Sequence, residues 1–504
     1  MVTLLREPGR PAAIREHPLA PWFAVAAVCF GAFMGQLDAS IVTVAFPALQ
    51  RQFGTGLAAV QWVSLGYLLA LTALLVPAGR WSDRVGRKLM YLYGFVIFGC
   101  ASAGCGLAPS LAVLIGLRVV QAAGAALLQA NSVALVVTSV PARTRRAALG
   151  VQAAAQAVGL ASGPVTGGLL VAAAGWRWVF FLNVPVGLLA VVAGVCLLPR
   201  TRGRAGHPAA DAHDPAADAP DHQPPAGQRP SGQRGTDPGG TFLLGVATVA
   251  GMLAVSALSG LGAPGWQAAG LAVLAVLAAV MLLRHERRTA APLLDLRALT
   301  AAGTGPALLG ALCAYLVLFG PLVLFPQVVS AKGGSAAAAG LLLTALPAGF
   351  GLAAVAADRL LPAGWPNRRR CLLGGAIAAG SAAALAVPGP DAVSVVLLGI
   401  LGAGLGIYTP ANNADIMAAV PARDAAAAGG MVNMTRGTGT ALGVTVVALG
   451  LHAGALLRSP NAGLTLSMAA LAAVALAGVW AAQLGPRASQ ASPGVPQASP
   501  GGPW

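Results

Sequence analysis

Two ionisable residues, Asp38 and Arg118, stand within long apolar runs of the sequence. At membrane depth such a group is costly unless it is paired or faces water, so a function is the first hypothesis for each. Asp38 falls roughly opposite Gln36, Ser40 and Thr43 on a helix, and both faces cannot form the wall of one cavity. The spacing therefore leaves open which face meets a cavity and which meets a neighbouring helix.

Polar residues at helical spacing follow Arg118 and recur in the second half of the chain. One stripe, at i, i+3, i+7 and i+11, is suited to lining a cavity, with a structural hydrogen-bonding role as the alternative: Arg118, Gln121, Ala125 and Gln129. Two comparable stripes supply further candidates for cavity residues: Tyr408, Asn412 and Asp415, and then Asn433, Arg436 and Thr440. Asp415 and Arg436 are candidates for an ion pair, unless both lie near a helix end and extend to its polar surface.

Glycines recur every four residues at Gly159, Gly163 and Gly167, with Pro164 between them. Small residues on one face allow another helix to approach closely, and a proline inside a helix leaves one backbone hydrogen bond unmade. We expect a helix interface that is able to flex. Ordinary small-residue packing without any gating is the alternative.

The segment Gly79-Arg-Trp-Ser-Asp83-Arg84-Val-Gly86-Arg87-Lys88 separates two apolar runs. We expect Gly79 and Gly86 to allow a tight turn between two helices. Asp83 stands among basic residues, Arg87 included, so that charge pairs can form and break at the mouth of the bundle. The alternative is a solvated run of charges.

The whole composition indicates that lipid surrounds these elements. The chain of 504 residues is 57% hydrophobic and 9% charged, with a mean hydropathy of +0.75. Soluble domains carry roughly a quarter of their residues as charges. About 20 apolar residues are needed to cross the hydrocarbon core, and fourteen runs approach or exceed that length. They are 22–49, 58–79, 89–107, 111–140, 147–174, 178–198, 241–261, 266–283, 306–329, 336–357, 371–387, 392–417, 425–450 and 464–483.

The basic residues indicate how these spans are oriented. Most of the 31 lysines and arginines fall on one side if the amino terminus is cytoplasmic. This is the positive-inside distribution, and it argues against nucleic acid as the explanation of a net charge of +16. We expect a multi-pass protein of the cell membrane, the inner membrane of a bacterium, with both termini cytoplasmic.

The charged hairpin has a weaker second copy, Asp358-Arg359 followed by Arg368-Arg369-Arg370. This predicts two parallel six-helix repeats that enclose a central cavity, with a two-helix insert between them. Residues 199–240 are rich in Pro, Gly, Asp, His and Arg and are expected to be a disordered linker. The expected order is a cytoplasmic tail (1–21), a six-helix repeat (22–198), the cytoplasmic linker (199–240), the two-helix insert (241–283), a cytoplasmic loop (284–305), a second six-helix repeat (306–484) and a cytoplasmic tail (485–504).

Five ordered segments resemble the fourteen-span drug:proton antiporters of the major facilitator superfamily. Leu37-Asp38-Ala-Ser-Ile41-Val42-Thr-Val-Ala-Phe-Pro47 resembles their first-span signature, and the Gly79 to Lys88 segment resembles the hairpin motif. Arg118-Val-Val-Gln121-Ala-Ala-Gly124 resembles the fourth-span proton-coupling motif. Gly159-Leu-Ala-Ser-Gly163-Pro164-Val-Thr-Gly167-Gly168 resembles the fifth-span antiporter motif, and Trp176-Arg177-Trp178-Val-Phe-Phe-Leu-Asn183-Val-Pro185 the start of the sixth span. Arg80-Trp81 and Gly437 depart from the residues usual in the family.

The resemblance implies an all-α membrane protein with the major facilitator fold: 14 transmembrane helices, arranged as two six-helix repeats plus a two-helix central insert. It implies a secondary transporter, not an enzyme, that exports drugs, antibiotics or other small amphipathic molecules by proton antiport with alternating access. Asp38 and Arg118 would couple the protons, unless Asp38 is a fixed strut against a neighbouring helix. The conformational gate would comprise Gly79, Asp83, Gly86, Arg87, Gly159, Gly163, Pro164 and Gly167.

No cofactor or metal is expected, because the proton motive force would drive transport and no G-x-x-x-x-G-K-[ST] segment for ATP is present. The expected partners are a small-molecule substrate, protons and the lipid bilayer, without nucleic acid, for a monomeric chain. Two alternatives remain open at this point. One is a proton-coupled uptake permease of the same fold, and the other is a membrane receptor or enzyme that transports nothing.

Overall fold

A computed structural model describes residues 7, 9–141, 144–201, 238–258, 265–289, 304–362, 364–419, 425–459 and 461–484. Four predicted segments therefore lie wholly or largely outside the described residues. They are the start of the 1–21 tail, most of the 199–240 linker, most of the 284–305 loop and the 485–504 tail.

Every regular element in the described ranges is a helix. The first half contains α1 (Ala12–Arg15), α2 (Ala20–Val44), α3 (Phe46–Phe53), α4 (Leu57–Val60), α5 (Trp62–Val85), α6 (Arg87–Leu107), α7 (Leu111–Ser139), α8 (Arg145–Ala173), α9 (Arg177–Phe181) and α10 (Asn183–Leu197). Two helices follow, α11 (Pro238–Leu258) and α12 (Gly265–Arg288). The second half contains α14 (Thr304–Ala331), α15 (Ala336–Leu360), α16 (Asn367–Leu385), α17 (Asp391–Ala419), α18 (Ala425–Leu456) and α19 (Ala462–Leu484).

Local sequence explains several helix boundaries. The first predicted span, 22–49, is divided at Ala45 into α2 and α3, and Pro47 occupies the first turn of α3, where its missing N–H removes no helical bond. Gly54 ends α3 with a φ of +61°, a conformation that glycine adopts without steric cost. Ser110 and Ser335 begin α7 and α15, and each hydroxyl accepts a hydrogen bond from a backbone N–H in the first turn.

Twelve helices within the described ranges are long and apolar enough to cross a membrane. The long helices α11, of 21 residues, and α16, of 19 residues, are not in that set. Three consecutive arginines, Arg368, Arg369 and Arg370, occupy the first turn of α16. The structure thus has an all-helical fold of the membrane-spanning kind, with twelve of the fourteen predicted spans meeting both criteria.

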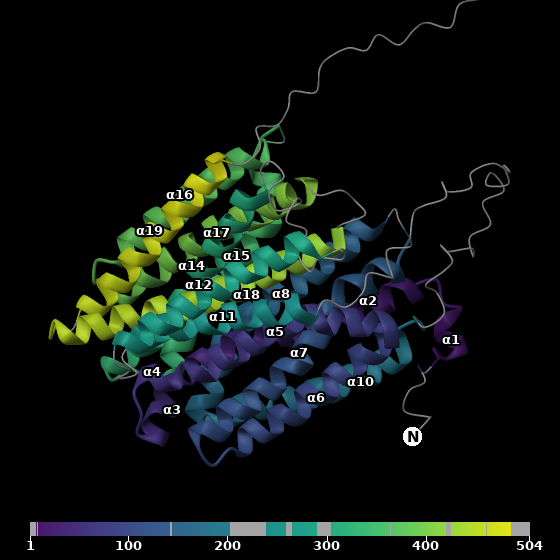
Figure 1. The fold of residues 1–504 in the computed structure, drawn as a ribbon, viewed down its shortest axis with the longest axis horizontal. Helices are drawn as coiled ribbons and strands as arrows, with labels where there is room; N and C mark the ends of the chain where they lie inside the picture. The colour runs from purple at the N-terminus through teal and green to yellow at the C-terminus, as the bar shows by residue number, and fades with distance from the viewer. Residues whose placement is uncertain are drawn as a thin grey trace, which may run out of the picture.

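The helices form two halves in which the same neighbours recur. In the first half α2 packs on α8, α6 on α7 and α10 on α6, and in the second half α14 packs on α18, α16 on α17 and α19 on α16. Figure 1 shows the purple and blue helices of the first half beside the green and yellow helices of the second. Contacts of α8 with α15 and of α5 with α18 join the halves, while α11 packs on α12, α5 and α18.

Both halves tie an early helix to a late one through a basic residue. At the start of α6 the Lys88 ammonium donates to the carbonyl oxygens of Val195 (2.9 Å) and Leu198 (2.6 Å) at the end of α10. At the start of α16 Arg368 donates to the carbonyl oxygen of Gln483 (3.1 Å) at the end of α19. The last carbonyls of a helix have no partner within it, so in both halves a cation satisfies them in the equivalent place.

Candidate functional site

Asp38 on α2 and Arg118 on α7 form a buried ion pair, with 2.6 Å between Asp38 Oδ2 and Arg118 Nη1. Their side chains are 0% and 1% exposed. The other carboxylate oxygen accepts hydrogen bonds from the amide groups of Gln121 (3.1 Å) and Asn183 (3.0 Å). Removing two charges from water is costly, and the attraction between them and the additional hydrogen bonds act against that cost.

Further contacts hold both members of the pair in place. Arg118 Nε donates to the carbonyl oxygen of Val63 on α5 (3.0 Å), and its guanidinium lies 4.1 Å from the centre of the Tyr67 ring. The Ser102 hydroxyl on α6 donates to the carbonyl oxygen of Phe180 (2.9 Å) and accepts from Gln121 and Asn183. We call Asp38, Ser102, Arg118, Gln121 and Asn183 the polar cluster. It joins α2, α6, α7 and α10 within one half of the molecule.

A central cavity of about 220 Å³ lies between the two halves. Its walls come from α2, α5, α7 and α8 of the first half and from α14 and α18 of the second. The lining residues of α7 and α8 lie near the connection between these helices, so the cavity is displaced toward the end of the bundle that carries the α5–α6 turn. Most of its polar lining is neutral: Gln36, Thr72, Gln129, Ser132, Gln152, Gln156, Asn433 and Thr440.

The two faces of α2 have different surroundings. Gln36 lines the central cavity, whereas Asp38 points toward α7 and is enclosed by the polar cluster. Asp38 therefore does pair with a neighbouring helix, as one of the two sequence hypotheses required. Tyr67 lines the cavity and also stacks on Arg118, so its ring stands between the ion pair and the cavity.

The prediction of one cavity-lining stripe on the fourth span is wrong in part. Of its four members only Gln129 lines the central cavity, while Arg118, Gln121 and Ala125 are buried against other helices. The stripe runs continuously along α7, but its first part packs against helices of the same half and so does not reach the cavity between the halves. Helical periodicity gives the face on which residues lie, not the neighbour that the face meets.

The candidates in the second half separate in the same way. Asn433 and Arg436 line the central cavity. Tyr408 and Asn412 are buried, and each donates to a backbone carbonyl, of Gly478 (3.1 Å) and of Ala307 (2.8 Å). The proposed pair of Asp415 with Arg436 is wrong, because Asp415 accepts a hydrogen bond from Asn367 (2.8 Å) and the Arg436 guanidinium lies 5.1 Å from the Tyr315 ring.

The predicted close approach along the glycines of α8 is confirmed, and the approaching helix is α2. A Cβ at Gly159 would collide with the Phe33 carbonyl oxygen, and one at Gly163 with the Ser40 hydroxyl. At Gly167 an added Cβ would lie 2.8 Å from the Ile41 side chain. These glycines let α2 and α8 pack backbone to backbone.

A second close contact on α8 joins the two halves. The Pro164 carbonyl oxygen would collide with a Cβ at Gly340 on α15, and Gly168 faces the Gly340 Cα at 3.1 Å from the position of its own added Cβ. We call Pro164, Gly168 and Gly340 the interhalf contact. It lies at the end of the bundle away from the α5–α6 turn. Gly340 belongs to none of the motifs found in the sequence, and only its contact with the other half marks it.

The turn between α5 and α6 is shorter than the two glycines of the charged segment predict. Gly86 is the turn residue between α5 and α6, with φ +123° and ψ +125°. Gly79 is not part of the turn, because α5 continues through it to Val85. Asp83 pairs with Arg87 at 2.8 Å, and both side chains are partly exposed, as expected for a charge pair that opens readily.

We expect Gly86→Ala to destabilise the protein, because an L side chain at this φ strains the backbone by about 1–3 kcal/mol. Gly99→Ala is the matched control on α6, where an added Cβ would meet open space. Thermal unfolding in detergent checks the difference. Equal midpoints for the two variants would contradict the strain at Gly86.

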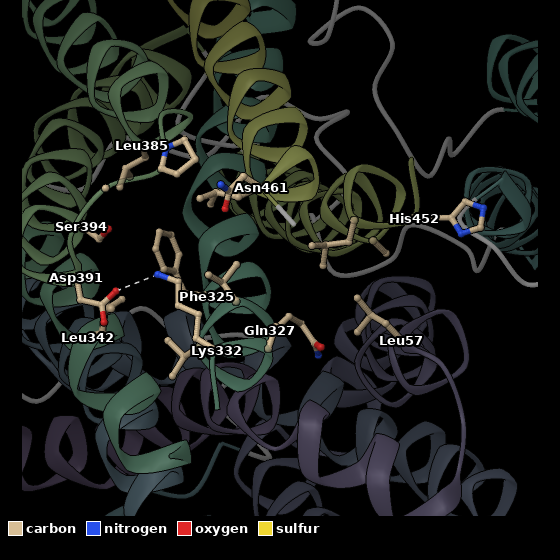
Figure 2. A pocket seen from close by; sticks show the side chains of 18 of the residues that line it. Leu57, Phe325, Gln327, Lys332, Leu342, Leu385, Asp391, Ser394, His452 and Asn461 are labelled. Carbon is tan, nitrogen blue, oxygen red and sulfur yellow. Dashed lines mark hydrogen bonds and ion pairs between the residues drawn. The ribbon is translucent and has the colours of Figure 1, made fainter. Parts of the chain in front are cut away.

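A larger pocket, of about 500 Å³, lies at the opposite end of the bundle from the α5–α6 turn. Figure 2 shows Lys332 and Asp391 pointing toward one another within it, at 3.3 Å. Both side chains are more than half exposed, so solvent screens this pair and it contributes little to stability. None of the site residues predicted from the sequence lines this pocket.

Comparison with known proteins gives the family. The model of the Major Facilitator Superfamily matches residues 28–230 and 240–444. The drug efflux pump JefA of Mycobacterium tuberculosis is 33% identical over 450 residues, which cover 85% of this chain and 81% of that protein. The tetracenomycin C resistance and export protein of Streptomyces glaucescens is 41% identical over 182 residues, 36% of this chain. This chain spans only 34% of the length of that Streptomyces protein. It spans 34% and 39% of the lengths of two other curated relatives.

The fold has its own counterpart among solved structures. A bacterial homolog of the human lysosomal transporter Spinster, in an inward-facing and unoccupied conformation, superposes with a TM-score of 0.59. The match covers 93% of this chain and 98% of that one at 16% identity, which speaks for the fold alone. The family match covers most of the chain, and this family is one of transporters rather than of enzymes. The chain therefore belongs to the Major Facilitator Superfamily of multi-pass membrane transporters.

Proposed function

We propose that the protein exports small amphipathic molecules, drugs and antibiotics among them, across the bacterial cell membrane in exchange for protons. The observation that carries this proposal is the buried pair of Asp38 and Arg118 beside the wall of the central cavity. Ionisable residues inside the membrane are rare and mark substrate pathways, ion pathways and proton relays, so a functional role is the first hypothesis for this pair. Relatives named as a drug efflux pump and as a resistance and export protein support the direction and the class of substrate.

We also propose the fourteen-span form of the superfamily. In it α11 and α16 cross the membrane together with the twelve helices that meet the length and hydropathy criteria. The recurrence of the same neighbouring helices supports two six-helix repeats, at 22–198 and 306–484. The helices α11 and α12 then form the central insert. The distribution of basic residues supports a cytoplasmic location for both termini, the linker and the α5–α6 turn.

With this orientation the transport cycle follows from two features. The interhalf contact closes the extracellular end, and the central cavity lies toward the cytoplasm, where substrate would enter. A proton on Asp38 would remove the negative charge that Arg118 faces and would weaken the polar cluster that joins α2 to α6, α7 and α10. Protonation would thereby favour one arrangement of these helices over another, which is the requirement for coupling.

The test uses the purified chain in liposomes with an acidic interior and a pH-sensitive dye inside. We expect the addition of a transported drug to release protons from the liposomes, in proportion to the drug that enters, because one gradient is exchanged for the other. Liposomes without the protein are the control. Drug uptake without proton release would contradict antiport, and drug entry together with further acidification of the interior would show symport instead.

A further inference from the structure

Arg436 is the charged residue among the described residues that line the central cavity. With the residues that the structure describes, its guanidinium forms no ion pair, and its Nε is buried without a hydrogen-bond partner among them. The two acidic residues that the sequence suggests as functional have other partners. Asp38 pairs with Arg118, and Asp415 accepts a hydrogen bond from Asn367. The cavity therefore contains a positive charge that the described residues do not neutralise.

An uncompensated cation at membrane depth is costly, and a buried guanidinium is usually satisfied by a carboxylate or phosphate. Its planar fork fits two oxygens of one carboxylate at once. A substrate with a carboxylate or phosphate group would supply the anionic partner that Arg436 does not find among the described residues. A cationic substrate would meet repulsion, since none of the described residues that line the cavity is a carboxylate that could attract it.

The surroundings of Arg436 indicate the rest of the ligand. Its guanidinium lies 5.1 Å from the Tyr315 ring, and Tyr315 stacks with Phe319 at an interplanar angle of 17°. All three residues line the cavity. Neutral amides from the other half face them, Gln129 and Gln152 among these. This arrangement offers one anion contact, a flat apolar wall and neutral hydrogen-bonding groups.

We propose that the central cavity selects organic acids, with the anionic group of the substrate bound to Arg436 and a planar apolar body placed against Tyr315 and Phe319. The inference rests on the proposed function, because it assumes that this cavity binds the exported molecule. It narrows the substrate class within that function: aromatic carboxylates and related monoanions bind, and their neutral or cationic counterparts are disfavoured.

The test measures equilibrium binding to the purified protein in detergent, so that it does not depend on transport. Three probes share one ring system and differ in charge: 2-naphthoate, 2-naphthamide and 2-naphthylmethylammonium. We expect saturable binding of the acid, at least about tenfold tighter than binding of the amide, since a hydrogen bond to a charged group is worth that factor or more. The ammonium should bind most weakly.

Two variants and a control assign the preference to Arg436. Arg436→Gln should weaken naphthoate binding roughly tenfold or more and leave naphthamide unchanged, and Arg436→Lys should restore part of the loss, because it keeps the charge without the bidentate geometry. Arg51→Gln removes an exposed arginine of α3 outside the cavity and should change neither affinity.

The results separate this inference from the proposed function. An unchanged ratio of acid to amide affinity in Arg436→Gln, or a wild type that binds the amide or the ammonium as well as the acid, overturns the inference. So does a wild type that shows no saturable binding of naphthoate. Proton release from liposomes by a neutral drug would leave the proposed function in place in each of these cases, whereas binding of naphthoate through Arg436 without any coupled proton release would refute the antiport and keep the inference.

Discussion

Asp38→Asn and Arg118→Gln are each expected to abolish substrate-driven proton exchange, and the protein that carries both changes is expected to recover stability without recovering exchange. Removing one partner of a buried ion pair leaves the other charge uncompensated and costs about 3–5 kcal/mol. Two neutral amides restore the charge balance and still hydrogen-bond to one another. They have no proton to exchange.

This comparison separates the two hypotheses for Asp38. If the carboxylate carries the proton, the double variant unfolds near the wild-type temperature and exchanges nothing. If it is a strut, the double variant regains both stability and exchange. Thermal unfolding and proton release from liposomes are measured on the same preparations. Exchange at the wild-type rate in the double variant would assign the proton to another residue, with Asp415 the first to examine.

The size of the expected effect follows from the driving force. A membrane potential of about 100 mV supplies about 2.3 kcal/mol for each charge moved, and one pH unit adds about 1.4 kcal/mol. A carrier without its protonatable group cannot use the free energy of the proton gradient. It still equilibrates substrate, so that uptake into liposomes falls to the level set by the substrate gradient alone.

Gly340→Ala is expected to prevent closure of the end of the bundle away from the α5–α6 turn, the extracellular end in the proposed orientation. Although it adds a single methyl group, it should stop transport. The new Cβ would collide with the backbone carbonyl oxygen of Pro164, which cannot rotate away as a side chain could. Overpacking of this kind typically costs about 1–3 kcal/mol, which disfavours the closed state by about 5- to 150-fold.

Gly351→Ala is the matched control on the same helix, because its Cβ would make an ordinary contact of 3.6 Å with Ala157 on α8. Both variants are compared in a cysteine-free protein that carries Ala336→Cys, a position at the start of α15 beside Gly168. A membrane-impermeant thiol reagent should label this cysteine faster in Gly340→Ala than in Gly351→Ala. Equal labelling and equal transport would mean that α8 and α15 accommodate the methyl group.

The sequence was sufficient for the elements and for the residues whose burial is expensive. Apolar runs of the length of a bilayer predict the helices, and the cost of a charge in such a run singles out Asp38 and Arg118 without any contact information. The glycines of α8 likewise predicted a close helix contact, because spacing by four residues places them on one face. These predictions depend on local spacing alone.

The predictions that are wrong depend on which helices are neighbours. Helical spacing predicts that Gln121 lines a cavity, but it lies in the polar cluster. Spacing also predicts a pair of Asp415 with Arg436, but Asp415 bonds to Asn367. Ser102 was missed because a serine in an apolar helix often bonds to its own backbone. Its role appears only once α6 is placed beside α7 and α10. The sequence predicts Gly79 in a turn because a glycine near a turn fits both the turn and the end of the helix before it.

The burial of the Asp38 carboxylate also has a consequence for a molecule that is not transporting substrate. With 0% exposure, and with Tyr67 between Arg118 and the cavity, the carboxylate has no contact with bulk water in this state. Under the proposed antiport a proton would reach Asp38 only when the helices rearrange, so an idle molecule would conduct no proton leak and would not dissipate the gradient. A cell could therefore keep many copies in its membrane before any toxic compound arrives, without spending respiration to maintain them.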